Sequence, residues 1–431
     1  MTGVIVVGAG VAGLTAARVL VDAGHEVVVV EARDRVGGRT WTHEVGGAPV
    51  DLGGSWIHGP FGNPLAEYVA DLGFRTTNDG VWGTGLHLFD AEGRACRPDQ
   101  LSALVATNGD FDPAEAAAHL PADSSFSDAA AWYVADRGLE PDHAEVARFA
   151  IEWLEGALNI GGLPTEVSTS GTASYVLHGG GNVVVEGGYR TLVDHLAAGL
   201  DIRSSTSVTA VEHRADGCVV TVRPAGSDGV DAGEHLSADH VIVTVPLPVL
   251  QARRIAFGPD IPEHLAAADR LAMAHLEKIV LRFDRPVWPS FQRRATFVAH
   301  DHLFTSWVDM SRHAGAPTLV GFYNPFATPG LSEVPPSERI GMAVEVLRRA
   351  WPDLPEPVAA HATDWTNDEF ALGSYSFIPV GGSPDDMSTL ASSPSGRLHL
   401  AGEHTVRDYF GTVHGAFVSG RRAASCVLDR V

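Results

Sequence analysis

The chain has 431 residues, of which 45% are hydrophobic and 19% charged, and its formal net charge is −23. An acidic surface repels phosphate, so this charge argues against nucleic acid and anionic membranes as partners and is compatible with cationic substrates. No stretch approaches the roughly eighteen uncharged apolar residues of a membrane-spanning helix. Three scattered cysteines, Cys96, Cys218 and Cys426, form neither a disulfide framework nor a metal-ligand spacing, so we expect a cytoplasmic protein without a metal site.

The first predicted elements are a strand over 4–7, a helix over 11–23 and a strand over 27–30. The turn before the helix reads G-A-G-V-A-G, and Glu31 ends the second strand. In this context the first glycine permits a tight turn, the second lets the backbone approach a pyrophosphate, and the third lets the helix pack on the sheet. The helix N-terminus offers N–H groups to phosphates, and the acid suits a ribose hydroxyl. The sequence therefore predicts a dinucleotide site at Gly8, Gly10, Gly13 and Glu31.

The rest of the chain alternates between helical and strand-rich regions. Predicted helices cover 64–72, 128–137, 142–158, 191–198, 338–350 and 415–428. Predicted strands cover 207–213, 218–223, 240–245, 276–283, 295–300, 303–308 and 318–323, with a strand and turn over 398–403. Residues 224–237 are rich in Gly, Asp and Ser and are predicted to form a surface hairpin or loop. Because two long insertions interrupt the nucleotide-binding pattern, we expect two domains that are discontinuous in sequence.

Four separated blocks of sequence point to one family. They are V-I-V-V-G-A-G-V-A-G-L-T-A-A near the start, E-A-R-D-R-V-G-G-R-T after the second strand, L-G-G-S-W-I-H-G at 52–59 and A-G-E-H-T-V-R-D-Y-F-G-T-V-H-G-A at 401–416. In the order and spacing of these blocks the chain resembles the flavin-dependent amine oxidase family over nearly its full length, although the middle helices match poorly. The resemblance implies FAD rather than a nicotinamide as the cofactor.

The same resemblance implies an α/β fold with two domains. One is a Rossmann-like FAD-binding domain, and the other is an inserted substrate domain of mixed sheet and helices, with the flavin ring at their interface. The FAD-binding domain is expected from residues 1–60, 183–250 and 379–431, and the substrate-binding domain from residues 61–182 and 251–378.

Matching the family motifs also implies which residues contact FAD. Glu31 is expected at the adenosine ribose, and Arg39 with nearby amides at the pyrophosphate. Residues 53–56 are expected along the isoalloxazine, and the backbone of Val208 at the adenine end. The full implied set is Gly8, Gly10, Ala12, Gly13, Glu31, Ala32, Arg33, Gly38, Arg39, Gly53, Gly54, Ser55, Trp56, Val208, Trp365, Phe370, Gly402, Glu403, Thr412, Val413 and Ala416.

Departures within the motifs indicate the subfamily. Some monoamine oxidases attach FAD to a cysteine just before a cage tyrosine; here Ser374 precedes Tyr375, so we expect noncovalent FAD. Thr412 stands where those enzymes carry a second cage tyrosine. The G-S-Y-S and W-I-H-G segments instead resemble polyamine oxidases of the spermine and acetylpolyamine type. The related histone lysine demethylases carry inserted arms and chromatin-binding modules, and this chain has nothing of that size.

The resemblance implies four residues near the reacting amine. Lys278, in an otherwise apolar strand, is expected near flavin N5 through a water molecule. Tyr375 is expected to form one wall of the amine pocket, because an aromatic face tolerates cationic character. His58 is expected to face the substrate, and Thr412 to lie near the ring. Glu152 and Glu155 lie in a helical stretch where an acid could bind a distal cation; a solvated helix face is the other interpretation.

The leading functional prediction is an FAD-dependent oxidase that transfers a hydride from the α-carbon of an amine, expected to be a polyamine, to flavin N5. The products are an imine, then an aldehyde, and with O2 hydrogen peroxide. Oxidation of monoamines or of specialised metabolites is an alternative. A flavin desaturase or isomerase, and a protein that keeps FAD for structure only, are further alternatives. The sequence leaves the particular amine and the oligomeric state open.

Overall fold

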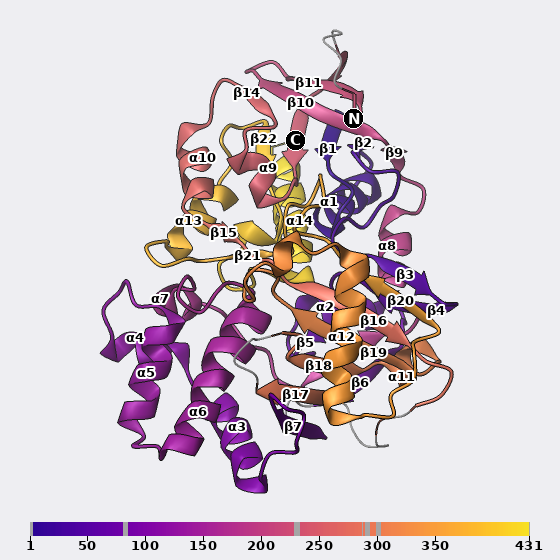
Figure 1. Cartoon of the computed structure of the whole chain (residues 1–431). Helices are drawn as coiled ribbons and strands as arrows, with labels where there is room; N and C mark the ends of the chain where they lie inside the picture. Colours follow the sequence, from indigo (N-terminus) through magenta and orange to yellow (C-terminus); the bar gives the residue numbers. More distant parts are fainter. Residues whose placement is uncertain are drawn as a thin grey trace.

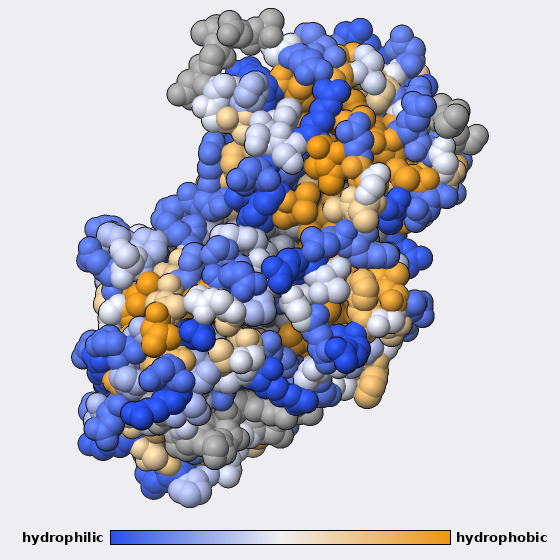
Figure 2. Space-filling view, turned by 90° about the vertical axis from the view of Figure 1, so that its right-hand side faces the viewer, coloured by the Kyte–Doolittle hydropathy of each residue, from blue (hydrophilic) through white to orange (hydrophobic). Residues whose placement is uncertain are grey.

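The computed structural model describes residues 3–80, 85–227, 233–286, 288, 294–298 and 303–430. Figure 1 shows the sheet that contains β1 and β2, together with both chain ends, in the upper half, and a group of helices beside a second sheet in the lower half. In the space-filling view the molecule has two lobes joined at a narrower waist (Figure 2). Within the described residues, no helix combines the length and apolar character that a membrane span requires.

The upper sheet is parallel and has the order β22-β13-β1-β2-β9. Its strands are β1 (Gly3–Val7), β2 (Glu26–Val30), β9 (Asp201–Arg203), β13 (His240–Val243) and β22 (Leu398–Leu400). Val4 and Val6 pack into one hydrophobic cluster, and Ile5 and Val7 into another. A strand that is buried on both faces in this way explains the unbroken V-I-V-V run.

Two long helices cover one face of this sheet, α1 (Val11–Asp22) and α14 (Val413–Leu428). They approach each other closely at Gly420, where an added Cβ would lie 2.2 Å from the carbonyl oxygen of Ala12. The first and last motifs of the chain are therefore held side by side by backbone contact.

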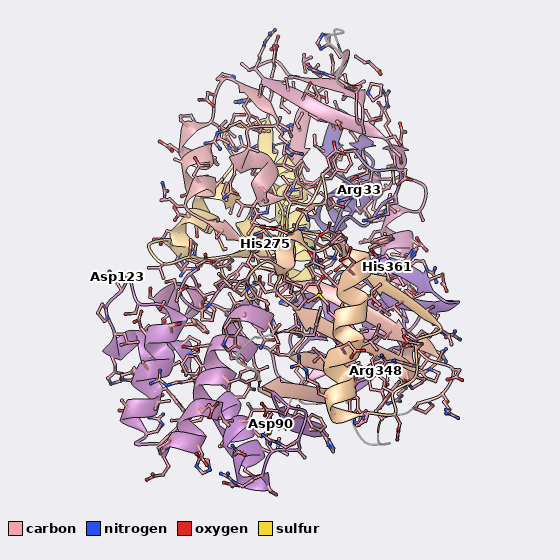
Figure 3. The ribbon with its side chains drawn as sticks, in the orientation of Figure 1. Arg33, Asp90, Asp123, His275, Arg348 and His361 are labelled. Carbon is pink, nitrogen blue, oxygen red and sulfur yellow. The ribbon has the colours of Figure 1, made fainter. Side chains whose placement is uncertain are left out.

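The lower sheet has six strands in the order β20-β16-β19-β18-β17-β7. They are β7 (Leu86–Asp90), β16 (Glu277–Arg282), β17 (Arg294–Val298), β18 (Ser306–Asp309), β19 (Thr318–Tyr323) and β20 (Ala359–Ala362). Helix α12 (Pro336–Ala350) packs against it around a core that includes Trp307 and Phe283. Figure 3 places His275, just before β16, where the two lobes meet.

Smaller sheets and the remaining helices complete the fold. The other strands are β3 (Thr42–Val45), β4 (Ala48–Asp51), β5 (Ile57–His58), β6 (Thr76–Gly80), β8 (Asn182–Val185), β10 (Thr206–His213), β11 (Cys218–Pro224), β12 (Glu234–Ala238), β14 (Ala256–Gly258), β15 (Ala272–Met273) and β21 (Ser376–Phe377). The other helices are α2 (Pro64–Asp71), α3 (Pro98–Asp110), α4 (Pro113–His119), α5 (Phe126–Asp136), α6 (Pro141–Phe149), η1 (Ala150–Ile160), α7 (Thr169–Thr172), α8 (Arg190–Ala197), α9 (Leu247–Gln251), α10 (Pro262–Asp269), α11 (Ser311–Ala314), η2 (Leu331–Glu333), α13 (Pro384–Ala391) and η3 (Glu403–Thr405).

One predicted element needs correction. The helix predicted over 142–158 is α6 followed by a π-helix, η1, which ends at Gly161 with a φ of +85°. Because π-helices are rare, a helical pattern in a sequence is interpreted as α-helix, and the change of winding at Ala150 was not predicted. The segment predicted as a surface hairpin or loop over 224–237 ends in strand β12, which pairs antiparallel with β11 and so agrees with the hairpin.

The predicted fold class is confirmed, but one detail differs from the expected domain boundaries. The strand expected over 295–300 is β17, and its last two positions lie outside the described residues. β14 and α10, expected in the substrate domain, lie beside β10 and α13 of the upper lobe. These contacts put the boundary between the lobes after α10.

Candidate active site

One cavity of about 1000 Å³ extends from the glycine-rich turn after β1 to the helical group of the lower lobe. It is lined by backbone at its upper end and by side chains from both lobes at its lower end. All predicted cofactor and catalytic residues line it except Gly13. The fold therefore brings together residues that are up to four hundred positions apart in the sequence.

The three glycines of the first turn differ in what surrounds them. Gly8 has a φ of +103°, and a Cβ added at Gly13 would lie 1.9 Å from the carbonyl oxygen of Gly8. At Gly10 an added Cβ meets nothing within 4 Å, and this position faces the cavity. Among the residues that the structure describes, no side chain caps the N-terminus of α1. Its N–H groups and dipole are therefore available to an anion such as a pyrophosphate.

Glu31 follows the last residue of β2 and lines the cavity. Its carboxylate accepts hydrogen bonds from the backbone N–H of Ala9 (2.6 Å) and of Arg33 (2.8 Å). A carboxylate has further lone pairs, which leaves acceptor capacity for ribose hydroxyls. Arg33 is held in turn by Asp368, at 2.5 and 2.9 Å.

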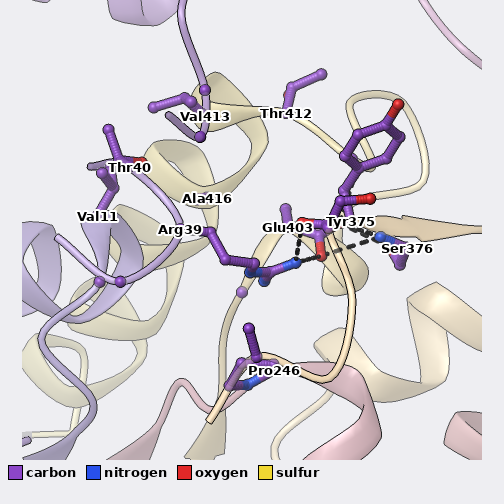
Figure 4. Close-up of a pocket in the computed structure, with 18 of the residues that line it drawn as sticks. Val11, Arg39, Thr40, Pro246, Tyr375, Ser376, Glu403, Thr412, Val413 and Ala416 are labelled. Atoms are coloured by element: carbon purple, nitrogen blue, oxygen red, sulfur yellow. Dashed lines mark hydrogen bonds and ion pairs between the residues drawn. The ribbon is translucent and has the colours of Figure 1, made fainter. Parts of the chain in front are cut away.

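An ion pair between the half-buried Arg39 and the buried Glu403 lines the cavity. Arg39 donates to Glu403 at 2.9 Å, and Ser376 donates its hydroxyl to the same carboxylate at 2.6 Å, as Figure 4 shows. The N–H of Gly411 adds a third bond at 2.8 Å. Burial alone raises the pKa of Glu403, but the charges of Arg39 and His404 and these hydrogen bonds outweigh it, so the pKa lies below its usual value. Glu403 therefore stays ionised and fixes Arg39 at the cavity wall.

Lys278 is the single lysine of the whole chain, and it is buried at the cavity. Its Nζ donates to the carbonyl oxygens of Asp51 (3.0 Å) and Gly53 (2.5 Å) and to the hydroxyl of Ser55 (2.6 Å). All three ammonium protons thus have acceptors. Burial lowers the pKa of Lys278 to about 8, although the nearby Asp51 carboxylate opposes the shift. A proton can therefore leave and return near neutral pH.

Two aromatic rings flank this ammonium group. Nζ lies 5.6 Å from the ring centre of Trp56 and 5.5 Å from that of Phe322. Both distances suit a cation–π interaction. The indole N–H of Trp56 donates to Asp79 at 2.9 Å, which fixes the plane of this ring.

The other predicted catalytic residues are each held by a neighbour. The hydroxyl of Tyr375 donates to the carbonyl oxygen of Leu158 at 2.9 Å, within the last turn of η1. Nδ1 of His58 lies 3.0 Å from the side-chain oxygen of Asn182. The Thr412 hydroxyl accepts from the N–H of Gly415 at 2.9 Å and so caps α14. A helix cap is a structural role that the sequence prediction for Thr412 did not include.

The structure separates the two acids of η1. Glu155 lines the cavity and accepts a hydrogen bond from Asn159 at 2.9 Å, and burial raises the pKa of its carboxyl. Glu152 does not line the cavity and interacts with Ser127. The π-helical winding thus places one of the two carboxylates inside.

Sequence analysis missed two acids beside Lys278. Asp51 is buried and accepts from Thr42 and from the N–H of Tyr189, and burial raises its pKa. Glu277, the residue before Lys278, is buried as well. A charged residue beside a lysine in an apolar strand was the available signal for Glu277.

The residues at the cavity fit FAD. Open space before Gly10, an uncapped helix N-terminus and an acid at the end of β2 match the phosphate and ribose groups of a dinucleotide. None of the three cysteines lines the cavity. Among the described residues, no group of three or more His, Cys, Asp or Glu side chains is arranged to hold a metal ion.

Comparison with known proteins defines the class. Residues 11–428 match the family of flavin containing amine oxidoreductases, and the chain belongs to this family. Polyamine oxidase 3 of Oryza sativa subsp. japonica is 31% identical over 99% of this chain and 89% of its own length. Polyamine oxidase 2 of Arabidopsis thaliana is 32% identical over 99% of this chain and 88% of its own length.

The solved structure of wild-type putrescine oxidase bound to putrescine superposes with a TM-score of 0.79. The match covers 100% of this chain and 99% of that one at 22% identity, so it shows a shared fold. The predicted family, fold, FAD cofactor and enzyme class are confirmed: the protein is an FAD-dependent amine oxidoreductase.

Proposed function

We propose that the protein is an oxidase of polyamines, including the diamine putrescine. An amine, water and O2 are converted to an aldehyde, a shorter amine or ammonia, and hydrogen peroxide. Bound FAD supplies the electron acceptor for the hydride equivalent that leaves the α-carbon. The plant relatives named as polyamine oxidases, similar along nearly the whole chain, support this substrate class.

The reacting nitrogen must be neutral, because its lone pair drives cleavage of the C–H bond. We propose that Tyr375, His58 and Thr412 border the site where this nitrogen lies. An apolar, aromatic wall disfavours the ammonium form of the substrate and so lowers the pKa of the bound amine. Lys278 holds or releases a proton beside the same site, which assists either hydrolysis of the imine or reoxidation of the cofactor.

The observation that carries the polyamine assignment is the Glu155 carboxylate. It lines the same cavity as Tyr375, and the Tyr375 hydroxyl donates a hydrogen bond to the carbonyl oxygen of Leu158, three residues further along the same helix. A substrate whose one nitrogen reacts near Tyr375 can extend a second, protonated nitrogen towards Glu155. A hydrogen bond between an ammonium group and a carboxylate contributes about 1.5–3 kcal/mol.

The test is peroxide release with putrescine, spermidine, spermine and butylamine, a matched monoamine. We expect Glu155→Gln to raise KM for putrescine by about tenfold or more and to leave KM for butylamine within about twofold. Glu152→Gln is the matched control, because this acid lies on the same helix outside the cavity. Equal effects of Glu155→Gln on both amines would remove the distal-cation role.

Oxidation of monoamines is the second candidate. The lining includes Phe111, Phe126, Tyr175 and Phe410, and these rings favour an aryl or alkyl amine without a second charge. The same assay decides between the two. A kcat/KM for aromatic monoamines well above that for every polyamine would establish the alternative.

Three further proposals concern the roles of the two domains, the way FAD is held and the cellular compartment. We propose that segments 1–60, 183–250 and 379–431 hold FAD without a covalent bond, and that 61–182 and 251–378, apart from β14 and α10, bind the amine. The position of Ser374 and the absence of cysteine from the lining support noncovalent binding. Three free cysteines support a reducing compartment such as the cytoplasm. Acid precipitation tests the noncovalent binding, because it releases noncovalent FAD into the supernatant. Cell fractionation tests the compartment.

A further inference from the structure

Glu277 is a charged side chain with no assigned task. It is fully buried (0% exposed), it precedes Lys278 on β16, and it does not line the cavity. An isolated carboxylate costs several kcal/mol to bury, so its surroundings must compensate this cost.

The compensation comes from one short segment of chain after β20. One carboxylate oxygen accepts from the hydroxyl of Thr363 (2.5 Å) and the N–H of Trp365 (3.0 Å). The other accepts from the N–H (2.7 Å) and the hydroxyl (2.8 Å) of Thr366. Four donors converge on one carboxylate, so Glu277 orders this segment.

The first connection leads from Glu277 to the backbone of Lys278. The Thr363 hydroxyl has a single proton, which it donates to Glu277, so its oxygen is free to accept the N–H of Lys278 at 2.8 Å. The N–H of Thr363 donates to the carbonyl oxygen of Lys278 at 2.9 Å. Both peptide groups of Lys278 are therefore fixed through a threonine that Glu277 orients.

The second connection leads to the strand segment that holds the lysine ammonium group. Trp365, whose N–H is bound by Glu277, donates its indole N–H to the carbonyl oxygen of Leu52 at 3.1 Å. The carbonyl groups on either side, those of Asp51 and Gly53, accept from Nζ of Lys278. The two side chains thus bind three consecutive carbonyl groups.

We propose that Glu277 is a positioning residue that fixes Lys278 and Trp365 against residues 51–53 and so sets where the lysine ammonium group lies at the reacting end of the cavity. This inference rests on the proposed role of Lys278. Glu277 touches neither the cavity nor the substrate, and it acts through Thr363 and Trp365.

The test compares Glu277→Gln, Lys278→Met and the double variant. A glutamine turns an NH2 group towards two of the four donors, so about half of the bonds are lost. We expect kcat to fall about tenfold, with KM for the amine within about twofold. In the Lys278→Met background the same change should alter kcat less than about twofold, because residues that act through one another are not additive.

A second readout does not depend on turnover. Because the chain has a single lysine, ¹³Cε-lysine labelling gives one side-chain resonance, and it reports Lys278 directly in the FAD-bound and the FAD-free protein. We expect Glu277→Gln to change the chemical shift of this resonance and the pH at which the resonance titrates. Thr363→Val removes one of the four hydrogen bonds and should shift the Lys278 resonance in the same direction by a smaller amount. This variant replaces Glu277→Gln in the test if Glu277→Gln does not fold. Asp386→Asn, another buried carboxylate that accepts from Arg270, is the control and should leave the resonance in place.

An unchanged resonance in Glu277→Gln, or in Thr363→Val where only that variant folds, overturns the proposal. Effects on kcat that multiply in the double variant overturn it as well, because they indicate general destabilisation. If Lys278→Met leaves turnover unchanged, the proposed role of Lys278 fails, and a shifted resonance still supports Glu277 as the residue that positions the lysine.

Discussion

The two ends of the cavity are built in different ways. At the upper end a ligand meets backbone: Gly8 and Gly10 belong to one turn, and Glu31 follows in the same βαβ unit. At the lower end Lys278 and Tyr375 come from separate segments, and long-range hydrogen bonds to Gly53 and Leu158 hold them. A site built from backbone groups depends on residues that are adjacent in the sequence. A site built from side chains depends on the fold that brings distant segments together. We therefore expect a substitution at the upper end to abolish folding and FAD binding, and a substitution at the lower end to reduce the reaction rate only in part.

The largest effect is expected at the upper end, from Gly13→Ala. The added Cβ lies 1.9 Å from the carbonyl oxygen of Gly8, and neither backbone can move without separating α1 from β1. We expect no folded, yellow protein, as measured by flavin absorbance and thermal unfolding. Gly341→Ala is the matched control in α12: its Cβ meets nothing within 4 Å, so it should stabilise by about 0.5–1 kcal/mol. A stable, FAD-loaded Gly13→Ala protein would contradict the backbone account of this end.

The next effect is expected at the lower end, from Lys278→Met. Methionine preserves most of the apolar volume and removes the ammonium group that binds the carbonyls of Asp51 and Gly53. We expect folded protein with bound FAD whose reduction by the amine, or reoxidation by O2, is about tenfold slower or more. Stopped-flow measurement of the two half-reactions identifies which step is affected. Unchanged rates in both would remove Lys278 from the mechanism.

This contrast also explains what could be predicted from the sequence. The glycines and Glu31 could be predicted because they depend on a local pattern, whereas Lys278 was predicted from the resemblance to the family motif. The hydroxyl partner of Tyr375, the buried Glu277 and the choice between Glu152 and Glu155 were not, because each depends on π-helical winding or on contacts between distant segments. The packing role expected for Gly13 could also be predicted from the motif, and it agrees with the 1.9 Å approach of an added Cβ to the carbonyl oxygen of Gly8.

The pH dependence of stability tests a buried histidine in the sheet behind the upper end of the cavity. His399 on β22 is buried and stacks on His240 with ring centres 5.7 Å apart. Burial, with the charges of His240 and Arg430, lowers the pKa of His399 to about 4. The unfolded chain, with a histidine pKa of about 6.5, binds the proton first, so stability is full above that pH and is lost as the pH falls towards 4.

The measurement is the difference in Tm between pH 7 and pH 5. We expect His399→Asn, which does not titrate in this range, to reduce the difference, while the solvent-exposed His235→Asn leaves it unchanged. His399 does not line the cavity, so bound FAD does not confuse the comparison. A pH dependence that is the same in both variants would assign acid sensitivity to other groups.

The smallest effect is expected where the two ends meet, at Thr412. Its hydroxyl accepts from the N–H of Gly415 and donates to the carbonyl oxygen of Tyr409 at 2.7 Å, so both its functions are used within the protein. Thr412→Ala should cost about 1 kcal/mol of stability, as the loss of a helix cap does, and Thr412→Ser should restore it. If the residue serves the amine site through the position of α14, turnover should fall only a few-fold in the alanine variant and recover with serine. A large loss of turnover in both variants would instead mean that the threonine methyl group, which serine lacks, packs against the reacting molecules.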